Sequence, residues 1–349
     1  MDYFQNIPDQ LYSTRREFIK KLSTAGAAVY LGIGDIFALD KSGKSIPDET
    51  ANFEYKYSTV SVKHVKEIGR WFDKLKSEEK IGKNETFRSY IGAFKFDPEE
   101  ILHGAKSLIL VSNRQKISSV VFNYKGKKTE ILIPTGYADD GLTFESVKAR
   151  IMEDIIKDSA KKLQEQVHLP LKTMSVRSGL ADYGKNNITF VDEFGSFHQL
   201  IGLYTDKELE DNWRPLNMLR LCKGCSICIK DCPTKCIREE NFVIEVDKCL
   251  PLFNELPDPF PEWLPSEVHH TLVGCLKCQY TCPANENRIK DIDKLADITE
   301  EETGFLLGES KNEKIHKQIA EKLKRFPSVN NLDYFRRNFK LAFANIING

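Results

Sequence analysis

The apolar residues between positions 60 and 163 recur at two different spacings, which together predict a mixed α/β fold. Helical spacing, with apolar residues three or four apart, marks residues 65–75 and residues 147–163. The continuous apolar run 107–111 instead suits a buried strand. Helices and strands are therefore expected to alternate through the first half of the chain.

Further strand patterns follow along the chain. Runs 119–124 and 129–133 flank a short turn of Lys and Gly residues, and this arrangement predicts a hairpin. Two more strands are expected at residues 188–191 and 196–204. After Pro283 the pattern turns helical to the end of the chain.

Composition adds only a little to the prediction of fold and binding partners. The chain has 349 residues, of which 41% are hydrophobic and 29% charged, and this is an ordinary soluble profile for about two domains. Its formal net charge is zero, so there is no overall attraction to nucleic acid or to anionic lipid.

Residues 1–40 contain a feature typical of exported proteins. The stretch 14–20, TRREFIK, resembles the twin-arginine export motif and precedes the weakly apolar stretch 22–34. That stretch is too short and too polar for a transmembrane span. We expect a twin-arginine signal over 1–40, a polar linker over 41–57, contact with the twin-arginine translocation machinery, and a periplasmic or outer-face location. A cytoplasmic protein with an amphipathic first helix is the alternative.

All nine cysteines lie between positions 222 and 282, and this crowding indicates metal or cluster ligation rather than disulfides. The spacing CxxCxxCxxxCP, which is typical of [4Fe-4S] clusters, begins at Cys222 and ends at Pro233. Structural zinc is the competing interpretation, although zinc sites usually use separate CxxC pairs.

A second run has only three cysteines before Pro283, so an eighth cluster ligand must come from elsewhere. In two-cluster ferredoxins the cysteine before the proline crosses to the other cluster. Cys236 and Cys249 are the candidates for the missing ligand. We favour Cys249 because it follows an expected hairpin, so the chain can return to the far side of the cluster. Cys236 then remains a free buried thiol. The expected ligand sets are Cys222, Cys225, Cys228 and Cys282 for one cluster, and Cys232, Cys249, Cys275 and Cys278 for the other.

This pattern resembles a known superfamily. The isolated Cys249, followed by a long loop and by GCLKCQYTCPAN at 274–285, is similar to the double-cluster domain of epoxyqueuosine reductases and reductive dehalogenases. The segment RSGLADYGKNN at 177–187, followed by FGS at 194–196, resembles the glycine-rich segment of the same proteins. The resemblance extends upstream to residues 98–107.

The resemblance implies a three-part organisation. A nitroreductase-like α/β domain would span 58–215 and bind cobalamin or another corrinoid. A ferredoxin-like double [4Fe-4S] domain would span 216–290, and a short helical segment would span 291–349. The corrinoid-binding positions implied by the matched motif are Gly179, Gly184, Lys185, Asn186, Asn187, Gly195 and Ser196.

The chain departs from the family where catalysis is expected. Epoxyqueuosine reductases have a catalytic aspartate shortly before the glycine-rich segment, but the matching stretch 167–172, VHLPLK, contains no carboxylate. Reductive dehalogenases use a tyrosine as the proton donor. A general acid must lie within hydrogen-bond reach of the substrate, and our candidates are Tyr137, Tyr183, His168 and Asp182.

The sequence thus predicts an exported oxidoreductase that depends on cobalamin and [4Fe-4S] clusters. It would take electrons from a low-potential donor and reduce a small organic electrophile, as reductive dehalogenases do. The sequence argues against tRNA as a partner, because only 66 residues follow Pro283 and export would separate the protein from tRNA. The alternatives are an electron-transfer protein without a corrinoid and a cytoplasmic tRNA-modifying enzyme of the epoxyqueuosine reductase type.

Overall fold

The structure is a computed structural model that describes residues 53–348 apart from 166–167, 241 and 311. The expected export segment 1–40 and most of the expected linker 41–57 lie outside the described residues, so both stay predictions. Within the described part of the chain, no helix is long and apolar enough to cross a membrane.

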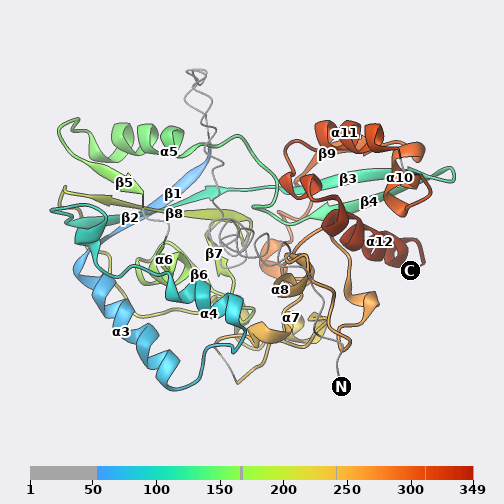
Figure 1. Cartoon of the computed structure of the whole chain (residues 1–349). Helices are drawn as coiled ribbons and strands as arrows, with labels where there is room; N and C mark the ends of the chain where they lie inside the picture. The colour runs from blue at the N-terminus through green and yellow to red at the C-terminus, as the bar shows by residue number, and fades with distance from the viewer. Residues whose placement is uncertain (1–52, 166–167, 241, 311, 349) are drawn as a thin grey trace, which may run out of the picture.

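The larger sheet is antiparallel, with strand order β1-β2-β8-β5. Alternate residues of β2 face opposite sides: Leu108 and Leu110 pack into the core formed with α3, α4 and α6, whereas Ile109 and Val111 pack beneath α5. Figure 1 shows α5 on one face of the sheet and the other three helices on the opposite face. The strands are β1 (Tyr55–Ser61), β2 (Ser107–Arg114), β5 (Leu163–Glu165) and β8 (His198–Thr205); the helices are α3 (Lys63–Ser77), α4 (Glu85–Gly92), α5 (Phe144–Ile151) and α6 (Leu171–Arg177).

The helix expected over 147–163 is shorter than its apolar pattern suggests. α5 ends at Ile151 and continues only as one π-helical turn, η2 (Met152–Ile156). The turn stops at Lys157, whose φ of 54° lies in the left-handed region that ends helices. Leu163, assigned to the same helix face from the sequence, lies instead in β5.

A second sheet, with strand order β4-β3-β9, packs against the C-terminal helices. The predicted hairpin forms its antiparallel pair, and β9 joins β3 in parallel. The helices expected after Pro283 are present, but the strand β9, which was not expected, comes before them in the chain. Figure 1 shows these helices gathered around the sheet, far from α3. The elements are β3 (Ile117–Tyr124), β4 (Lys127–Ile133), β9 (Ile292–Ile298), α10 (Glu300–Leu307), α11 (Glu313–Lys322), η7 (Pro327–Asn330) and α12 (Leu332–Asn348).

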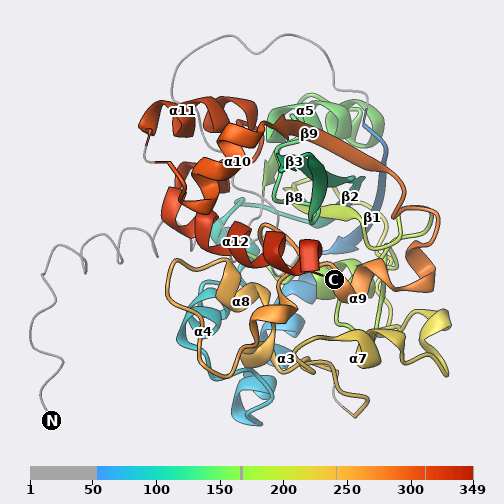
Figure 2. The same cartoon turned by 90° about the vertical axis from the view of Figure 1, so that its right-hand side faces the viewer.

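The cysteine-containing segment, which holds the nine cysteines at 222–282, lies between β8 and β9 in sequence and consists of short helices joined by loops. Figures 1 and 2 place α7 and α8 below α12, and α8 lies beside α4 in both views. α7 packs against α9, so the two cysteine runs lie side by side. The elements are η3 (Arg220–Cys222), α7 (Ile227–Asp231), η4 (Val246–Lys248), α8 (Pro251–Asn254), η5 (Ser266–Val268), α9 (Lys277–Tyr280) and η6 (Pro283–Asn285).

Candidate iron–sulfur site

The first predicted set of cysteines lies together around α7 and the end of α9. Burial is the largest cause of the rise in the Cys228 pKa to about 11, and the nearby thiols of Cys222, Cys225 and Cys282 raise it further. Cys282 belongs to the second run and lies just after α9. A cysteine of the second run therefore joins the group formed by the first run, as in two-cluster ferredoxins.

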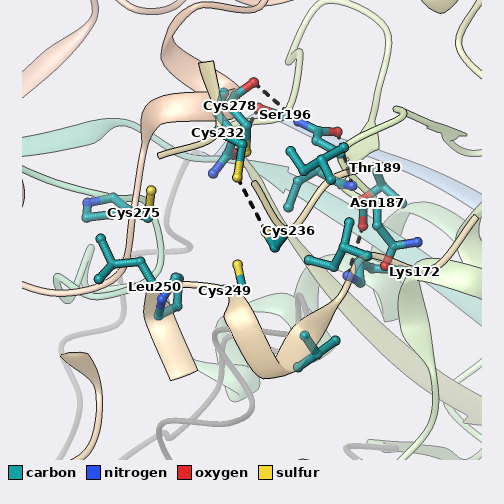
Figure 3. A pocket seen from close by; sticks show the side chains of 18 of the residues that line it. Lys172, Asn187, Thr189, Ser196, Cys232, Cys236, Cys249, Leu250, Cys275 and Cys278 are labelled. Carbon is teal, nitrogen blue, oxygen red and sulfur yellow. Dashed lines mark hydrogen bonds between the residues drawn. The ribbon is translucent and has the colours of Figure 1, made fainter. Parts of the chain in front are cut away.

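The second predicted set lines a cavity of about 160 Å³ (Figure 3). Cys232, Cys249, Cys275 and Cys278 all contribute to its wall. Cys249, the residue that follows η4, reaches the cavity from the side opposite Cys278. A fifth thiol, that of Cys236, also lines this cavity, so the free thiol expected from the sequence lies within the site.

The donor chemistry of both groups fits iron–sulfur clusters. Burial raises the pKa of Cys275 to about 12, so this thiol ionises only when a metal replaces its proton. No three His, Cys, Asp or Glu side chains in the described residues converge closely enough to hold one metal ion. Zinc ligands would converge in that way, whereas thiols spread around a cavity suit a larger inorganic cluster.

Several residues predicted to bind the corrinoid connect the α/β domain to the cysteine-containing segment. The Nζ of Lys185 donates a hydrogen bond to the backbone oxygen of Cys225 at 2.9 Å, and the Nδ2 of Asn186 donates one to the oxygen of Cys278 at 3.3 Å. Ser196 donates its backbone N–H to the Oδ1 of Asn285 at 2.9 Å. These contacts fix both cysteine runs against the α/β domain.

The glycines of the same motif permit close packing. A Cβ on Gly195 would approach the Oδ1 of Asn285 to 2.4 Å, and one on Gly184 would approach the Oδ1 of Asn186 to the same distance. Gly179 lies elsewhere, in a polar hollow of about 720 Å³ beside Arg214. The corrinoid role of these positions stays a prediction.

The cavity beside the thiols does not fit a corrinoid. Pockets for drug-sized ligands have volumes of about 300–1,000 Å³, and a corrinoid is larger than most drugs, but this cavity measures about 160 Å³. Asn186, Asn187 and Ser196 line its wall, and the side chains of Asn186 and Ser196 are engaged with the cysteine-containing segment. We therefore derive no chemical step through cobalt.

The structure separates the four candidate proton donors. Only Tyr137 lines the cavity, and its hydroxyl donates a hydrogen bond to the Oε1 of Glu255. Tyr183 is buried and hydrogen-bonds to Thr173 at 3.0 Å, and Asp182 forms an ion pair with Arg214. His168 does not line the cavity, and burial lowers its pKa. Their catalytic roles stay predictions, and geometry favours Tyr137.

Lys172 is a member of the site that the sequence did not indicate. It lies on α6, lines the cavity, and donates a hydrogen bond to the backbone oxygen of Asn187 at 3.0 Å. Burial lowers its pKa to about 8, whereas the nearby thiols of Cys249 and Cys278 raise it. Within the described residues no carboxylate pairs with it. The anionic thiolates of the second group are therefore its compensating charges.

Replacing Lys172 with methionine should lower the reduction potential of the second cluster. A half-buried cation beside the cluster stabilises the reduced and more negative state, so its loss disfavours reduction. We expect a decrease on the order of 60 mV, a tenfold change for a one-electron couple. Anaerobic redox titration followed by electron paramagnetic resonance measures the shift. Lys172→Arg retains the charge and should remain close to wild type; equal potentials for methionine and wild type would contradict the assignment.

The Glu255 carboxyl is a second group that the sequence did not indicate. Burial raises its pKa to about 8, although the hydrogen bond from Tyr137 opposes the rise. Burial also raises the pKa of Tyr137 well above its usual value. The pair is therefore protonated at neutral pH, with Tyr137 on the cavity side.

This raised pKa predicts a loss of stability as pH increases. The unfolded carboxyl ionises near pH 4.5 and the folded one near pH 8, so stability is full below pH 4.5 and is lost as pH rises through 8. Between pH 6 and 8.5 we expect wild type to lose on the order of 2 kcal/mol, whereas Glu255→Gln should show a flatter profile. Anaerobic denaturant unfolding measures both. The exposed Glu262→Gln should show the same dependence of stability on pH as wild type. If Glu255→Gln also showed the wild-type dependence, the Glu255 carboxyl would not be its cause.

Comparison with known proteins agrees with this geometry. The family described as a 4Fe-4S double cluster binding domain matches residues 221–285, which contain all nine cysteines. This chain carries a double [4Fe-4S] cluster domain. Among curated proteins, this iron–sulfur chain is 26% identical over 212 residues to the epoxyqueuosine reductase of Cyclobacterium marinum, covering 55% of the chain and 62% of that protein. It is 33% identical over 117 residues to that of Gloeobacter violaceus, covering 33% and 35%.

Solved structures show that the iron–sulfur chain has the mixed α/β fold of epoxyqueuosine reductases. The enzyme from Streptococcus thermophilus matches with a TM-score of 0.57 and 18% identity, over 95% of this chain and 81% of that one. The enzyme from Bacillus subtilis matches with a TM-score of 0.58 and 18% identity, over 84% and 77%. The predicted fold class is confirmed. By contrast, the first two curated relatives are matched over only 62% and 50% of their length.

These matches also change two predictions made for the iron–sulfur chain. The similarity is to epoxyqueuosine reductases, and the reductive dehalogenase half of the predicted resemblance receives no support from it. One matching structure is an epoxyqueuosine reductase with a modified tRNA-Tyr stem loop, at a TM-score of 0.54 and 16% identity. The prediction against tRNA is therefore wrong. It gave weight to the short C-terminal segment, yet the match covers 82% of that tRNA-bound chain.

Proposed function

We propose that the chain is an iron–sulfur oxidoreductase of the epoxyqueuosine reductase type that reduces a modified nucleoside in tRNA. The observation that carries the proposal is the likeness to a tRNA-bound epoxyqueuosine reductase over 94% of this chain, cysteine-containing segment included. The docked arrangement of the two parts supports it, because Lys185, Asn186 and Ser196 hold the thiol groups against the α/β domain.

The residues around the cavity have defined parts in this proposal. Cys222, Cys225, Cys228 and Cys282 would hold the first cluster, and the thiols around the cavity would hold the second. When bound, the two clusters would supply single electrons to a substrate held beside the second one. Lys172 stabilises the added negative charge there. Tyr137 is the proposed proton donor, since it lines the cavity, and Glu255 is placed to return a proton to its phenol oxygen.

Anaerobically purified protein with reconstituted clusters tests the proposal. It is incubated with dithionite and with tRNA that carries epoxyqueuosine, in parallel reactions with and without added cobalamin. Digestion and mass spectrometry of the nucleosides then measure queuosine. We expect queuosine to form, and to fall at least tenfold in Tyr137→Phe. Unchanged nucleosides under conditions in which a known epoxyqueuosine reductase is active would overturn the proposal.

The small cavity favours a second candidate, an electron-transfer protein without a corrinoid. This candidate needs the two clusters but no substrate chamber. It predicts about eight irons per chain, no cobalt uptake, rapid reduction by a low-potential donor, and no change in any tRNA nucleoside. The nucleoside assay separates the two candidates, and iron, sulfide and cobalt analysis of the same protein shows which cofactors it carries.

A further inference from the structure

Five thiols surround the cavity of about 160 Å³, whereas a [4Fe-4S] cluster has four corners. Four of the five, Cys232, Cys249, Cys275 and Cys278, are the predicted ligands. The fifth, Cys236, is 2% exposed and points into the same space (Figure 3). Its position needs an explanation, because a thiol that only filled space could lie anywhere in the core.

The distance between two of these thiols identifies a pair that cannot fill two separate corners. The Sγ atoms of Cys232 and Cys236 are 3.5 Å apart. Two thiolates bound to different irons of one cluster are separated by two iron–sulfur bonds and an iron–iron edge, so they cannot lie in contact. Cys232 and Cys236 therefore cannot occupy two corners from these positions, and they compete for one.

The backbone brings Cys236 to this place by a tight turn. Lys235 donates its N–H to the oxygen of Cys232, at 3.2 Å, and has a φ of 54°, so the chain reverses directly after Pro233 and Thr234. The oxygen of Cys236 then accepts the N–H of Glu245 at 2.8 Å, which holds the second thiol beside the first. The approach of the two sulfurs is thus built into the fold.

We propose that Cys236 is an alternative ligand of the second cluster, for the corner that Cys232 otherwise occupies. In the exchange the bond from iron to the Cys232 sulfur breaks and the bond to the Cys236 sulfur forms. The proton of the Cys236 thiol passes to the released Cys232 thiolate, and no electron is gained or lost. This inference rests on the double-cluster domain and not on the proposed reaction with tRNA.

Iron and sulfide analysis of anaerobically prepared variants tests the exchange. Cys232→Ala should retain about eight irons per chain, because Cys236 takes its place, and Cys236→Ala should retain the same number. The double variant should lose about half of its iron. Cys275→Ala is the matched control: no neighbouring thiol is in contact with Cys275, so it should lose about half by itself. Equal iron loss in Cys232→Ala and Cys275→Ala would overturn the proposal.

A second pair of variants keeps the test decisive if Cys232→Ala fails to fold. Cys232→Ser retains nearly the same shape, and it is compared with Cys232→Ser combined with Cys236→Ala. If Cys236 takes the corner, the combined variant loses about half of the iron that the single variant retains. The two variants would contain equal iron if serine oxygen or no residue takes the corner, and this result would overturn the proposal. The paramagnetic signal of the first cluster reports that each chain is folded.

Discussion

Replacing Cys278 with alanine should remove the second cluster and leave the first, so that iron falls from about eight to about four atoms per chain. Cys278 lies on α9 with its thiol in the second group, where Cys275, Cys236 and Cys232 are its neighbours. No other thiol is placed to take its corner, because Cys236 lies against Cys232 instead. Reduction of any substrate that takes its electrons from the second cluster should then cease.

Cys225→Ala is the matched variant for this experiment. Its thiol belongs to the first group, with Cys222, Cys228 and Cys282. It should lose the same amount of iron but retain the paramagnetic signal of the second cluster, the signal that Cys278→Ala lacks. If both variants lost the same signal, the division of the thiols into two groups would be incorrect.

Replacing Asn285 with leucine should have the largest effect on stability. Asn285 is fully buried; its Oδ1 accepts the N–H of Ser196, and its Nδ2 donates to the Oγ of Ser196 and to the oxygen of Gln279, each at 2.8 Å. Leucine leaves these groups buried and unpaired. Because each unpaired buried group costs about 1–3 kcal/mol, we expect a loss of about 3 kcal/mol.

Anaerobic denaturant unfolding of the cluster-loaded protein measures this loss. Asn287→Leu, two residues further along on the exposed surface, should stay within about 0.5 kcal/mol of wild type. Asn285→Asp retains the acceptor for Ser196 but loses both N–H donors, so it should fall between the two. A leucine variant as stable as wild type would show that this contact does not hold the cysteine-containing segment in place.

Local sequence predicted what depends on local spacing. The cysteine runs, the hairpin of β3 and β4, and helix α3 were all predicted from residues close together in the chain, because their geometry is set within a few residues. The helix expected over 147–163 was misjudged because apolar spacing continues across Lys157, where the backbone turns left-handed. The spacing of apolar residues contains no information about such a change in backbone conformation.

The site residues that the sequence missed depend on distant contacts. Nothing near Lys172 or Glu255 in the sequence marks them as site residues. Lys172 lies near Cys249 and Cys278, and Glu255 accepts a hydrogen bond from Tyr137, only because distant parts of the chain pack together. The glycine-rich motif was recognised, but its contacts with Cys225 and Cys278 depend on tertiary packing. Cys236 was identified as the extra cysteine, and only the fold places it against Cys232.

The parallel pairing of β9 with β3 has a consequence for biogenesis. Strand β3 leaves the ribosome early, but its partner β9 is synthesised only after the whole cysteine-containing segment. Until then the apolar surface of the hairpin lacks its third strand and its covering helices, and such surfaces attract chaperones or aggregate. Starving cells of iron should therefore lower the yield of soluble protein, because chains that lack clusters would linger in this half-closed state.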